Sequence, residues 1–227
     1  MRASALIRQG YLLRIVEDLS VSPHVFAGPS SVEGGNCPNC EKALLHMLSI
    51  KRDAAELNKT PVTGEGTIPL LFCWTCEIAD GVLIYRVRRG GREIELLQFS
   101  SGDSFDDFPY ANYPVYFPRK GVLLEPLPEQ DQALIQELNG GDAETLARFD
   151  ETHRHLTIPR HQLGGEPYLF DPEALFACPG CGDPMQHLAT LGDESGGERG
   201  FAGNRYVQTV FHLCPRCLAV AAFQRSE

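Results

Sequence analysis

Runs of apolar residues, either continuous or alternating with polar ones, recur along this 227-residue chain and are typical of β-strands. They cover 43–50, 67–72, 82–88, 93–98, 185–191, 206–213 and 218–223. Between two of these runs, Gly90 and Gly91 predict a tight hairpin turn, since glycine tolerates the positive φ that such a turn requires. The pattern therefore predicts a mainly β protein with some helix.

Helical spacing is found at the N-terminus and in the middle of the chain. Apolar residues recur at roughly helical intervals over residues 1–22 and predict an amphipathic helix packed on the body, with a transit peptide as the alternative. Arginines interrupt this stretch, so we expect no export signal. Residues 126–160 predict a helical linker, in which one helix spans 128–138 and Asp142 caps a second. The linker would join two β-rich parts, 23–125 and 161–227.

All eight cysteines belong to Cys-x-x-Cys pairs, a spacing that lets two thiolates on one tight turn bind the same cation. The pairs are Cys37/Cys40, Cys73/Cys76, Cys178/Cys181 and Cys214/Cys217. Sets of four thiolates favour zinc or an iron–sulfur centre over hard cations, and the spacings do not match ferredoxin patterns, so zinc is the better candidate. Disulfides, a thioredoxin-like redox pair and a single metal-binding cluster are the alternatives.

The cysteine pattern repeats within the chain. Thirty-two residues separate Cys40 from Cys73, and 32 also separate Cys181 from Cys214, so a shift of 141 positions superimposes both sets of four. The same shift places His46 on His187. We therefore expect two pseudo-symmetric, duplicated halves, each with its own four-cysteine site.

Each half should close its own site, and the ligand sets follow from the repeat. They are Cys37, Cys40, Cys73 and Cys76 in the first half, and Cys178, Cys181, Cys214 and Cys217 in the second. Four protein ligands leave no open coordination position, which makes both expected zinc ions structural rather than catalytic. Because the sulfurs already satisfy zinc, we expect His46 and His187 to be strand histidines packed beneath the cysteine turns, with a metal role as the alternative.

Charge narrows the classes of function. The chain has 20 Lys+Arg against 30 Asp+Glu, a formal net charge of -10, which disfavours nucleic acid because its phosphates would be repelled. Eight thiolates and two Zn2+ would make the formal charge -14. No run of 18 apolar residues is present, so we expect no membrane partner. A basic protein or peptide is the favoured partner.

Two features are candidates for binding such a partner. An acidic segment contains Phe105, Asp106, Asp107 and Phe108, whose rings could anchor a basic peptide; a solvated loop is the alternative. Gly28 and the pair Gly164 and Gly165 occupy matching places before the first cysteine of each half. Glycine permits close approach of another backbone, so a peptide could lie there; tight turns that support the cysteine pairs are the alternative.

Several segments resemble the YwqG-like family of uncharacterised bacterial proteins, which is related to the eukaryotic programmed cell death 2 proteins and to ribosomal-protein chaperones. The resemblance is carried by His161-Gln-Leu-Gly-Gly-Glu-Pro167, Cys178-Pro-Gly-Cys-Gly182, 185–191, 206–211 and Cys214-Pro-Arg-Cys217, and more loosely by Ala27-Gly28-Pro29. It covers about 23–223 and implies a duplicated β-rich fold without known catalysis. The eukaryotic relatives hold a ribosomal protein through a peptide segment, and some bacterial ones lie near toxin systems. Many bacterial relatives lack the full cysteine set that this chain has.

These features predict a cytoplasmic, zinc-stabilised, non-enzymatic interaction module of the chaperone, adaptor or toxin-immunity type. We find no Ser/His/Asp order with local support, no phosphate-binding loop and no open zinc motif that would indicate an enzyme. Two other classes of function stay open as alternatives. One is an enzyme that uses the glycine-rich segments, and the other is a nucleic-acid-binding zinc ribbon.

Overall fold

The computed structural model describes residues 5–73, 76, 81–101, 116–141, 144, 147, 161–168, 176–192 and 207–226. Its strands are β1 (Tyr11–Val16), β2 (Val25–Phe26), β3 (Leu45–Lys51), β4 (Thr67–Phe72), β5 (Val82–Arg88), β6 (Glu93–Ser100), β7 (Lys120–Pro126), β8 (Gln162–Leu163), β9 (Gln186–Gly192), β10 (Val207–Cys214) and β11 (Ala219–Ser226). The helical elements are α1 (Glu129–Gly140) and two 3-10 turns, η1 (Ala55–Leu57) and η2 (Arg89–Gly91).

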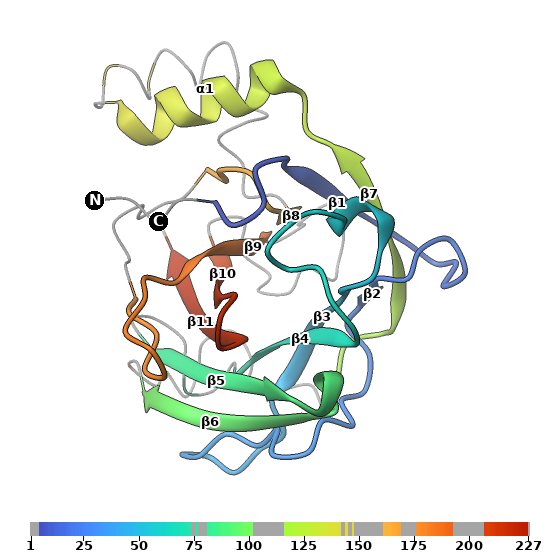
Figure 1. Cartoon of the computed structure of the whole chain (residues 1–227), viewed down its shortest axis with the longest axis vertical. Coiled ribbons are helices and arrows are strands. Elements are labelled where there is room, and N and C mark those ends of the chain that lie inside the picture. Colours follow the sequence, from blue (N-terminus) through green and yellow to red (C-terminus); the bar gives the residue numbers. More distant parts are fainter. Residues whose placement is uncertain are drawn as a thin grey trace.

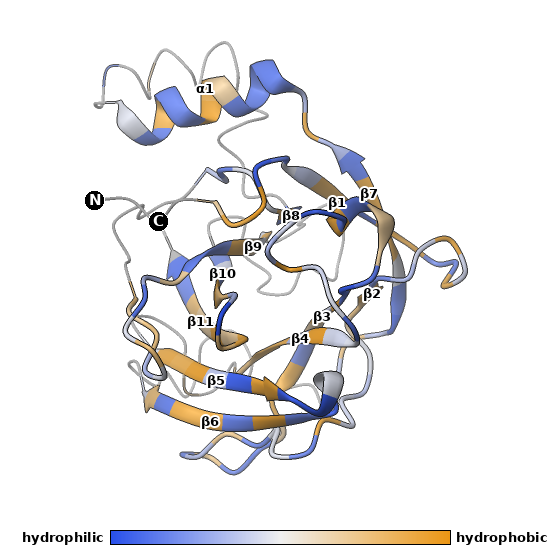
Figure 2. Ribbon diagram, viewed as in Figure 1, coloured by the Kyte–Doolittle hydropathy of each residue, from blue (hydrophilic) through white to orange (hydrophobic). Residues whose placement is uncertain are grey.

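The strands form one antiparallel sheet that curls round a shared core (Figure 1). Their order is β4-β3-β2-β7-β1-β8-β9-β10-β11-β5-β6. Buried side chains from both ends of this order, such as Leu70, Tyr85 and Phe211, belong to the same apolar cluster. β5 begins with the apolar residues 82–85, and Figure 2 shows its start as hydrophobic, because both faces of the strand are covered: Leu83 and Tyr85 belong to the main cluster and Ile84 to a second one. The prediction of a mainly β protein is confirmed.

The strand predictions agree closely with the structure. The runs at 67–72 and 82–88 are β4 and β5 with the same bounds, and the other five predicted runs lie within three residues of observed strands. The predicted hairpin turn joins β5 to β6, and Gly90 and Gly91 have φ of +64° and +96°. Apolar runs therefore located seven strands, but they missed β7, which is as long as β3 and β5.

The predicted N-terminal helix is wrong. Residues Tyr11–Val16 form β1, which pairs along its whole length with β7 and, through Tyr11 and Leu12, with β8. Tyr11, Leu13 and Ile15 alternate along the strand and pack on the main core, a period of two that competes with the helical spacing. The backbone pairing with β7, which the sequence pattern did not reveal, decides in favour of the strand.

The first predicted helix of the linker is present as α1, which lies outside the curled sheet at the top of Figure 1. It continues two residues beyond the predicted end at 138, and the N–H of Gly141 donates to the carbonyl of Leu138 at 3.0 Å. Ile135 and Leu138 form a small apolar cluster with Leu127, separate from the main core. Of the second predicted helix, only Glu144 and Ala147 lie within the described residues, and both are helical.

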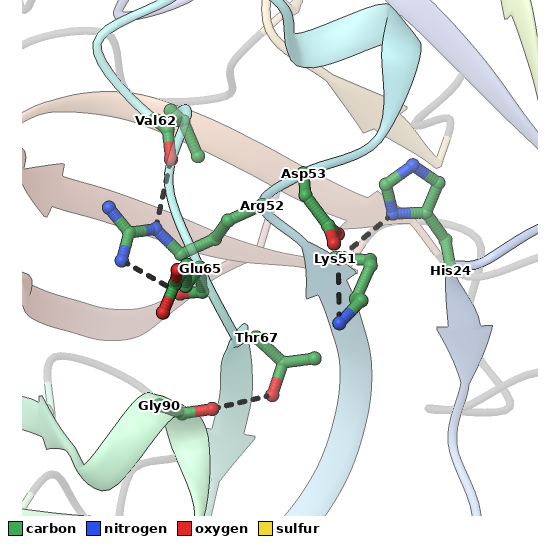
Figure 3. A network of polar contacts seen from close by, with 8 residues as sticks. All are labelled: His24, Lys51, Arg52, Asp53, Val62, Glu65, Thr67 and Gly90. Carbon is green, nitrogen blue, oxygen red and sulfur yellow. Dashed lines mark hydrogen bonds and ion pairs between the residues drawn. The ribbon is translucent and has the colours of Figure 1, made fainter.

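A single arginine organises the long connection between β3 and β4. Arg52 donates from Nε to the carbonyl of Val62 at 2.9 Å and from Nη1 to the carbonyl of Glu65 at 3.1 Å (Figure 3). Beside it, the N–H of Lys51 donates to Nδ1 of His24 at 3.2 Å. These bonds hold the connection against the end of the β3–β4 ladder that lies farther from the cysteines.

The sheet closes through a side chain. Tyr85 on β5 is fully buried, and its hydroxyl donates to the carbonyl of Pro69 at 2.8 Å and accepts from the N–H of Leu71 at 2.9 Å. Both backbone groups belong to β4, the terminal strand of the sheet, on the edge that faces away from β3. The Tyr85 hydroxyl thus replaces part of a backbone ladder between β4 and β5.

Replacing Tyr85 with Phe should therefore lower the free energy of unfolding by about 1–3 kcal/mol, because two buried backbone groups lose their partner. Urea unfolding followed by circular dichroism measures the change. Tyr11→Phe is the matched control, since the Tyr11 hydroxyl makes one exposed bond to the carbonyl of Glu56 at 3.4 Å. Equal unfolding free energies for the two variants would contradict the closing role of Tyr85.

Candidate metal centres

The first four predicted ligands converge at one end of the β3–β4 ladder. Cys37 and Cys40 lie on the turn before β3, and Cys73 directly follows β4. The ladder pairs Leu45 with Phe72 and so carries the two ends of the chain to the same place. With Cys76, these residues bring their Sγ atoms within 4.8 Å of one another.

The second four ligands converge in the same way at the end of the β9–β10 ladder. Cys178 and Cys181 lie on the turn before β9, and Cys214 is the last residue of β10. Cys217 lies on the turn that joins β10 to β11. The four Sγ atoms again lie within 4.8 Å of one another, so the structure brings together every predicted metal ligand, in the predicted sets.

The two cysteine turns have the same hydrogen bonds. In the first, the N–H of Glu41 donates to the carbonyl of Cys37 at 3.0 Å, and Glu41 has a φ of +60°. In the second, the N–H of Gly182 donates to the carbonyl of Cys178 at 2.8 Å, and Gly182 has a φ of +76°. A left-handed residue directly after the second cysteine therefore closes each turn and directs both sulfurs to one side.

The sulfur positions fit a tetrahedral metal ion. A tetrahedron with metal–sulfur bonds of about 2.3 Å has sulfur–sulfur edges of about 3.8 Å. The Sγ atoms of Cys40 and Cys73 are 3.7 Å apart, and those of Cys181 and Cys214 are 3.6 Å apart. All eight cysteines are free thiols at distances well beyond the roughly 2 Å of a disulfide. Each cluster can therefore hold one metal ion.

Within each cluster, the pKa values of the thiols differ, because each thiol has different burial and different hydrogen bonds. Burial raises the pKa of Cys76 to about 11. Burial also acts to raise the pKa of Cys40, but hydrogen bonds from the Lys42 backbone and from neighbouring sulfurs outweigh it and lower the pKa. In the second cluster, burial raises the pKa of Cys214, whereas backbone hydrogen bonds outweigh burial and lower the pKa of Cys178. Adjacent thiolates repel one another, and a bound cation would relieve this repulsion.

His46 and His187 lie on β3 and β9, outside both cysteine clusters. Each has its Nε2 within hydrogen-bond distance of a hydroxyl three residues later, at 2.8 Å to Ser49 and 2.9 Å to Thr190. Burial lowers the pKa of His46 to about 4 and that of His187 to about 3, so both rings are neutral at pH 7. Four sulfurs complete each cluster without them.

The glycines predicted to bind a partner are buried against the protein itself. The N–H of Gly164 donates to the carbonyl of Leu188 at 2.8 Å, and that of Gly165 donates to the carbonyl of Ile7 at 2.7 Å. The N–H of Gly28 donates to the carbonyl of Phe117 at 3.0 Å. These segments are thus occupied by neighbouring parts of the chain. Their binding role stays a prediction, as does that of Phe105, Asp106, Asp107 and Phe108, which lie outside the described residues.

Comparison of the chain with protein-family models, with curated proteins and with solved structures finds no match. The resemblance to the YwqG-like proteins therefore stays a prediction. Within the part of the chain that the structure describes, every helix is too short or too polar to cross a membrane.

Replacing Cys178 with Ser should remove one bound metal ion per chain and leave the other, because the two ligand sets share no residue. The melting temperature should also fall, since the energy of metal binding contributes to folding. Elemental analysis and thermal unfolding measure the two effects, with Cys37→Ser as the matched variant for the first centre. Loss of both metal ions from either variant would contradict two independent centres.

Replacing Gly165 with Val should cost more than about 2 kcal/mol of folding stability. Gly165 has a φ of +60°, and a Cβ there would lie 2.7 Å from the Cα of Gly10. Gly90→Val is the control, because Gly90 also has a positive φ but its Cβ would meet only the Cα of Gly66, at 3.7 Å. Urea unfolding of both variants separates the cost of steric crowding at Gly165 from the cost of a positive φ. A smaller loss of unfolding free energy at Gly165 than in the control would contradict the tight-turn assignment.

Proposed function

We propose that each four-cysteine cluster holds a structural zinc ion and that the protein is a non-enzymatic interaction module that binds a basic protein segment. The observation that carries the proposal is the convergence of two complete sets of four Sγ atoms. Four thiolates fill the tetrahedral shell of Zn2+ and leave no position for a substrate or an activated water molecule. Zinc in such a site stabilises a fold instead of performing chemistry.

The positions of the clusters support a structural role. The first cluster fastens the turn before β3 to the end of β4, and the second fastens the turn before β9 to the β10–β11 connection. Each zinc ion would thus tie together chain segments that are separated by more than 30 residues. Such a tie limits the conformations of the unfolded chain and makes metal binding part of folding.

We further propose that the chain consists of two duplicated, pseudo-symmetric halves joined by the helical linker that contains α1. The β3–β4 ladder shifts its register beside Met47, and the β9–β10 ladder shifts beside Leu188, its counterpart 141 residues later. Outward from the central β7–β1 pair, the sheet continues as β2-β3-β4 on one side and as β8-β9-β10 on the other. This mirrored order supports a pseudo-twofold relation between the halves.

The charge of the protein supports a basic partner. The formal net charge of -10 would become -14 with both zinc ions bound. Several basic side chains already form ion pairs within the chain, among them Arg14 with Glu125, Arg89 with Glu33 and Lys120 with Glu17. The excess carboxylates would attract a cationic segment over a long range and would repel nucleic acid. The cysteines must stay reduced in order to bind zinc, which favours a reducing compartment. We therefore propose that the protein is cytoplasmic.

Elemental analysis tests the metal part of the proposal. Protein purified without added metal should contain two zinc ions per chain, one for each cluster. Its cysteines should react with a thiol reagent only after a chelator has removed the zinc. One zinc ion or fewer, together with four or more reactive thiols, would contradict the proposal of two zinc centres.

Binding of a fluorescent lysine- and arginine-rich peptide tests the partner part. Its affinity, measured by fluorescence anisotropy, should fall steadily as NaCl is raised, because salt shortens the screening length from about 10 Å at 0.1 M to about 3 Å at 1 M. An acidic peptide of the same length and a DNA duplex are the controls. Affinity for DNA equal to that for the basic peptide would contradict the proposed class of partner.

A further inference from the structure

The two cysteine centres differ at one pair of equivalent positions. The residue directly before the second cysteine is Asn39 in the first centre and Gly180 in the second, 141 positions later. Asn39 donates from Nδ2 to the Sγ of Cys76 at 3.3 Å. Hydrogen bonds of this kind orient metal ligands and strengthen metal binding. Glycine has no side chain with which to make the same bond to Cys217, the counterpart of Cys76.

An arginine from a distant strand occupies the space that glycine leaves. A Cβ at Gly180 would lie 2.4 Å from Nη2 of Arg86 and 3.4 Å from the Sγ of Cys217. The guanidinium therefore lies at the place from which the Asn39 side chain projects in the first centre, and the Sγ of Cys217 borders the same place. Arg86 belongs to β5, which follows the cysteines of the first centre in the chain.

Neighbouring strands and a carboxylate hold Arg86 in this place. β5 pairs with β11, so that Arg86 lies opposite Ala219, two residues after Cys217. Nη1 of Arg86 donates to Oε2 of Glu95 on β6 at 3.3 Å. Its Nε, in contrast, is buried and has no hydrogen-bond partner among the residues that the structure describes. A buried N–H group of a cation is expected to have an acceptor, and the nearby thiolates are of the required charge.

We propose that Arg86 is a positioning residue of the second centre, where its guanidinium takes the role that the Asn39 amide has in the first. It would donate a charge-assisted hydrogen bond to the Cys217 thiolate and offset part of the double negative charge of a zinc ion bound by four thiolates. This inference rests on the proposed zinc occupancy. It also means that the second zinc ion should be released faster whenever β5 separates from β11.

The test is the rate at which a chelator removes each zinc ion. Arg86→Met removes the cation and keeps the apolar stem, so one of the two zinc ions should leave at least about 10-fold faster, as is typical for loss of a residue that orients a ligand. The other zinc ion should leave at the rate of the unchanged protein. Asn39→Ala should have the opposite pattern, since it affects only the first centre.

Arg88→Met is the matched control. Arg88 lies two residues further along β5 and also forms an ion pair with Glu95, but its side chain is more exposed, at 47% against 22% for Arg86. Its loss should leave both release rates unchanged. Equal release rates in Arg86→Met and Arg88→Met would overturn the proposed role of Arg86.

A second substitution separates the proposed role from simple structural support. Gly180 is outside the positive-φ region, so Gly180→Asn can be accommodated once Arg86 has been shortened. In the Arg86→Met background it should restore slow zinc release, because the new amide can donate to Cys217 as Asn39 does to Cys76. Arg86→Lys should release zinc more slowly than Arg86→Met. Failure of both rescues would overturn the inference, whereas fewer than two zinc ions in the unchanged protein would contradict the zinc proposal itself.

Discussion

The convergence of four sulfurs at one end of a two-stranded ladder is the constraint on which this fold depends. It occurs twice, and in both places the ladder aligns the two cysteine turns, while a left-handed residue after the second cysteine directs the sulfurs inward. The sulfurs repel one another as thiolates, so the geometry is favourable only with a cation among them. A bound metal ion would therefore stabilise the close approach of the strand ends, and the strand ends place the four sulfurs where they could hold it.

The strands that follow the two ladders are arranged differently on the two sides of the sheet. On the second side, β11 follows β10 as a hairpin, but on the first side β5 leaves β4 and pairs with β11. Tyr85 then joins β5 to β4 through its hydroxyl, and Arg86, the next residue, reaches the second cysteine centre. The single strand β5 therefore packs in the main core, bonds to β4 through Tyr85 and reaches the second cysteine cluster through Arg86. In the proposed role of Arg86, this arrangement would compensate for the difference between Asn39 and Gly180.

The sequence was sufficient for the cysteine sets and for seven of the strands, because both depend on local spacing. The eight ligands follow from the Cys-x-x-Cys pairs and their repeat, and β4 and β5 follow from runs that are mostly apolar. It failed where pairing between distant segments decides the structure. Residues Tyr11–Val16 are a strand because β7 lies beside them, and β2 and β8 are too short to have a pattern. The sequence around Arg86 likewise gives no indication that this residue lies near the second cysteine cluster, because only folding brings it there.

X-ray absorption at the zinc edge tests the central claim most directly, because it reports the atoms bound to the metal in the folded protein. The account predicts a single shell of four sulfur atoms at about 2.3 Å, averaged over both centres. A shell that includes nitrogen or oxygen at about 2.0–2.1 Å would contradict it. Such a shell would mean that a histidine or a water molecule replaces a cysteine, and that at least one centre is open.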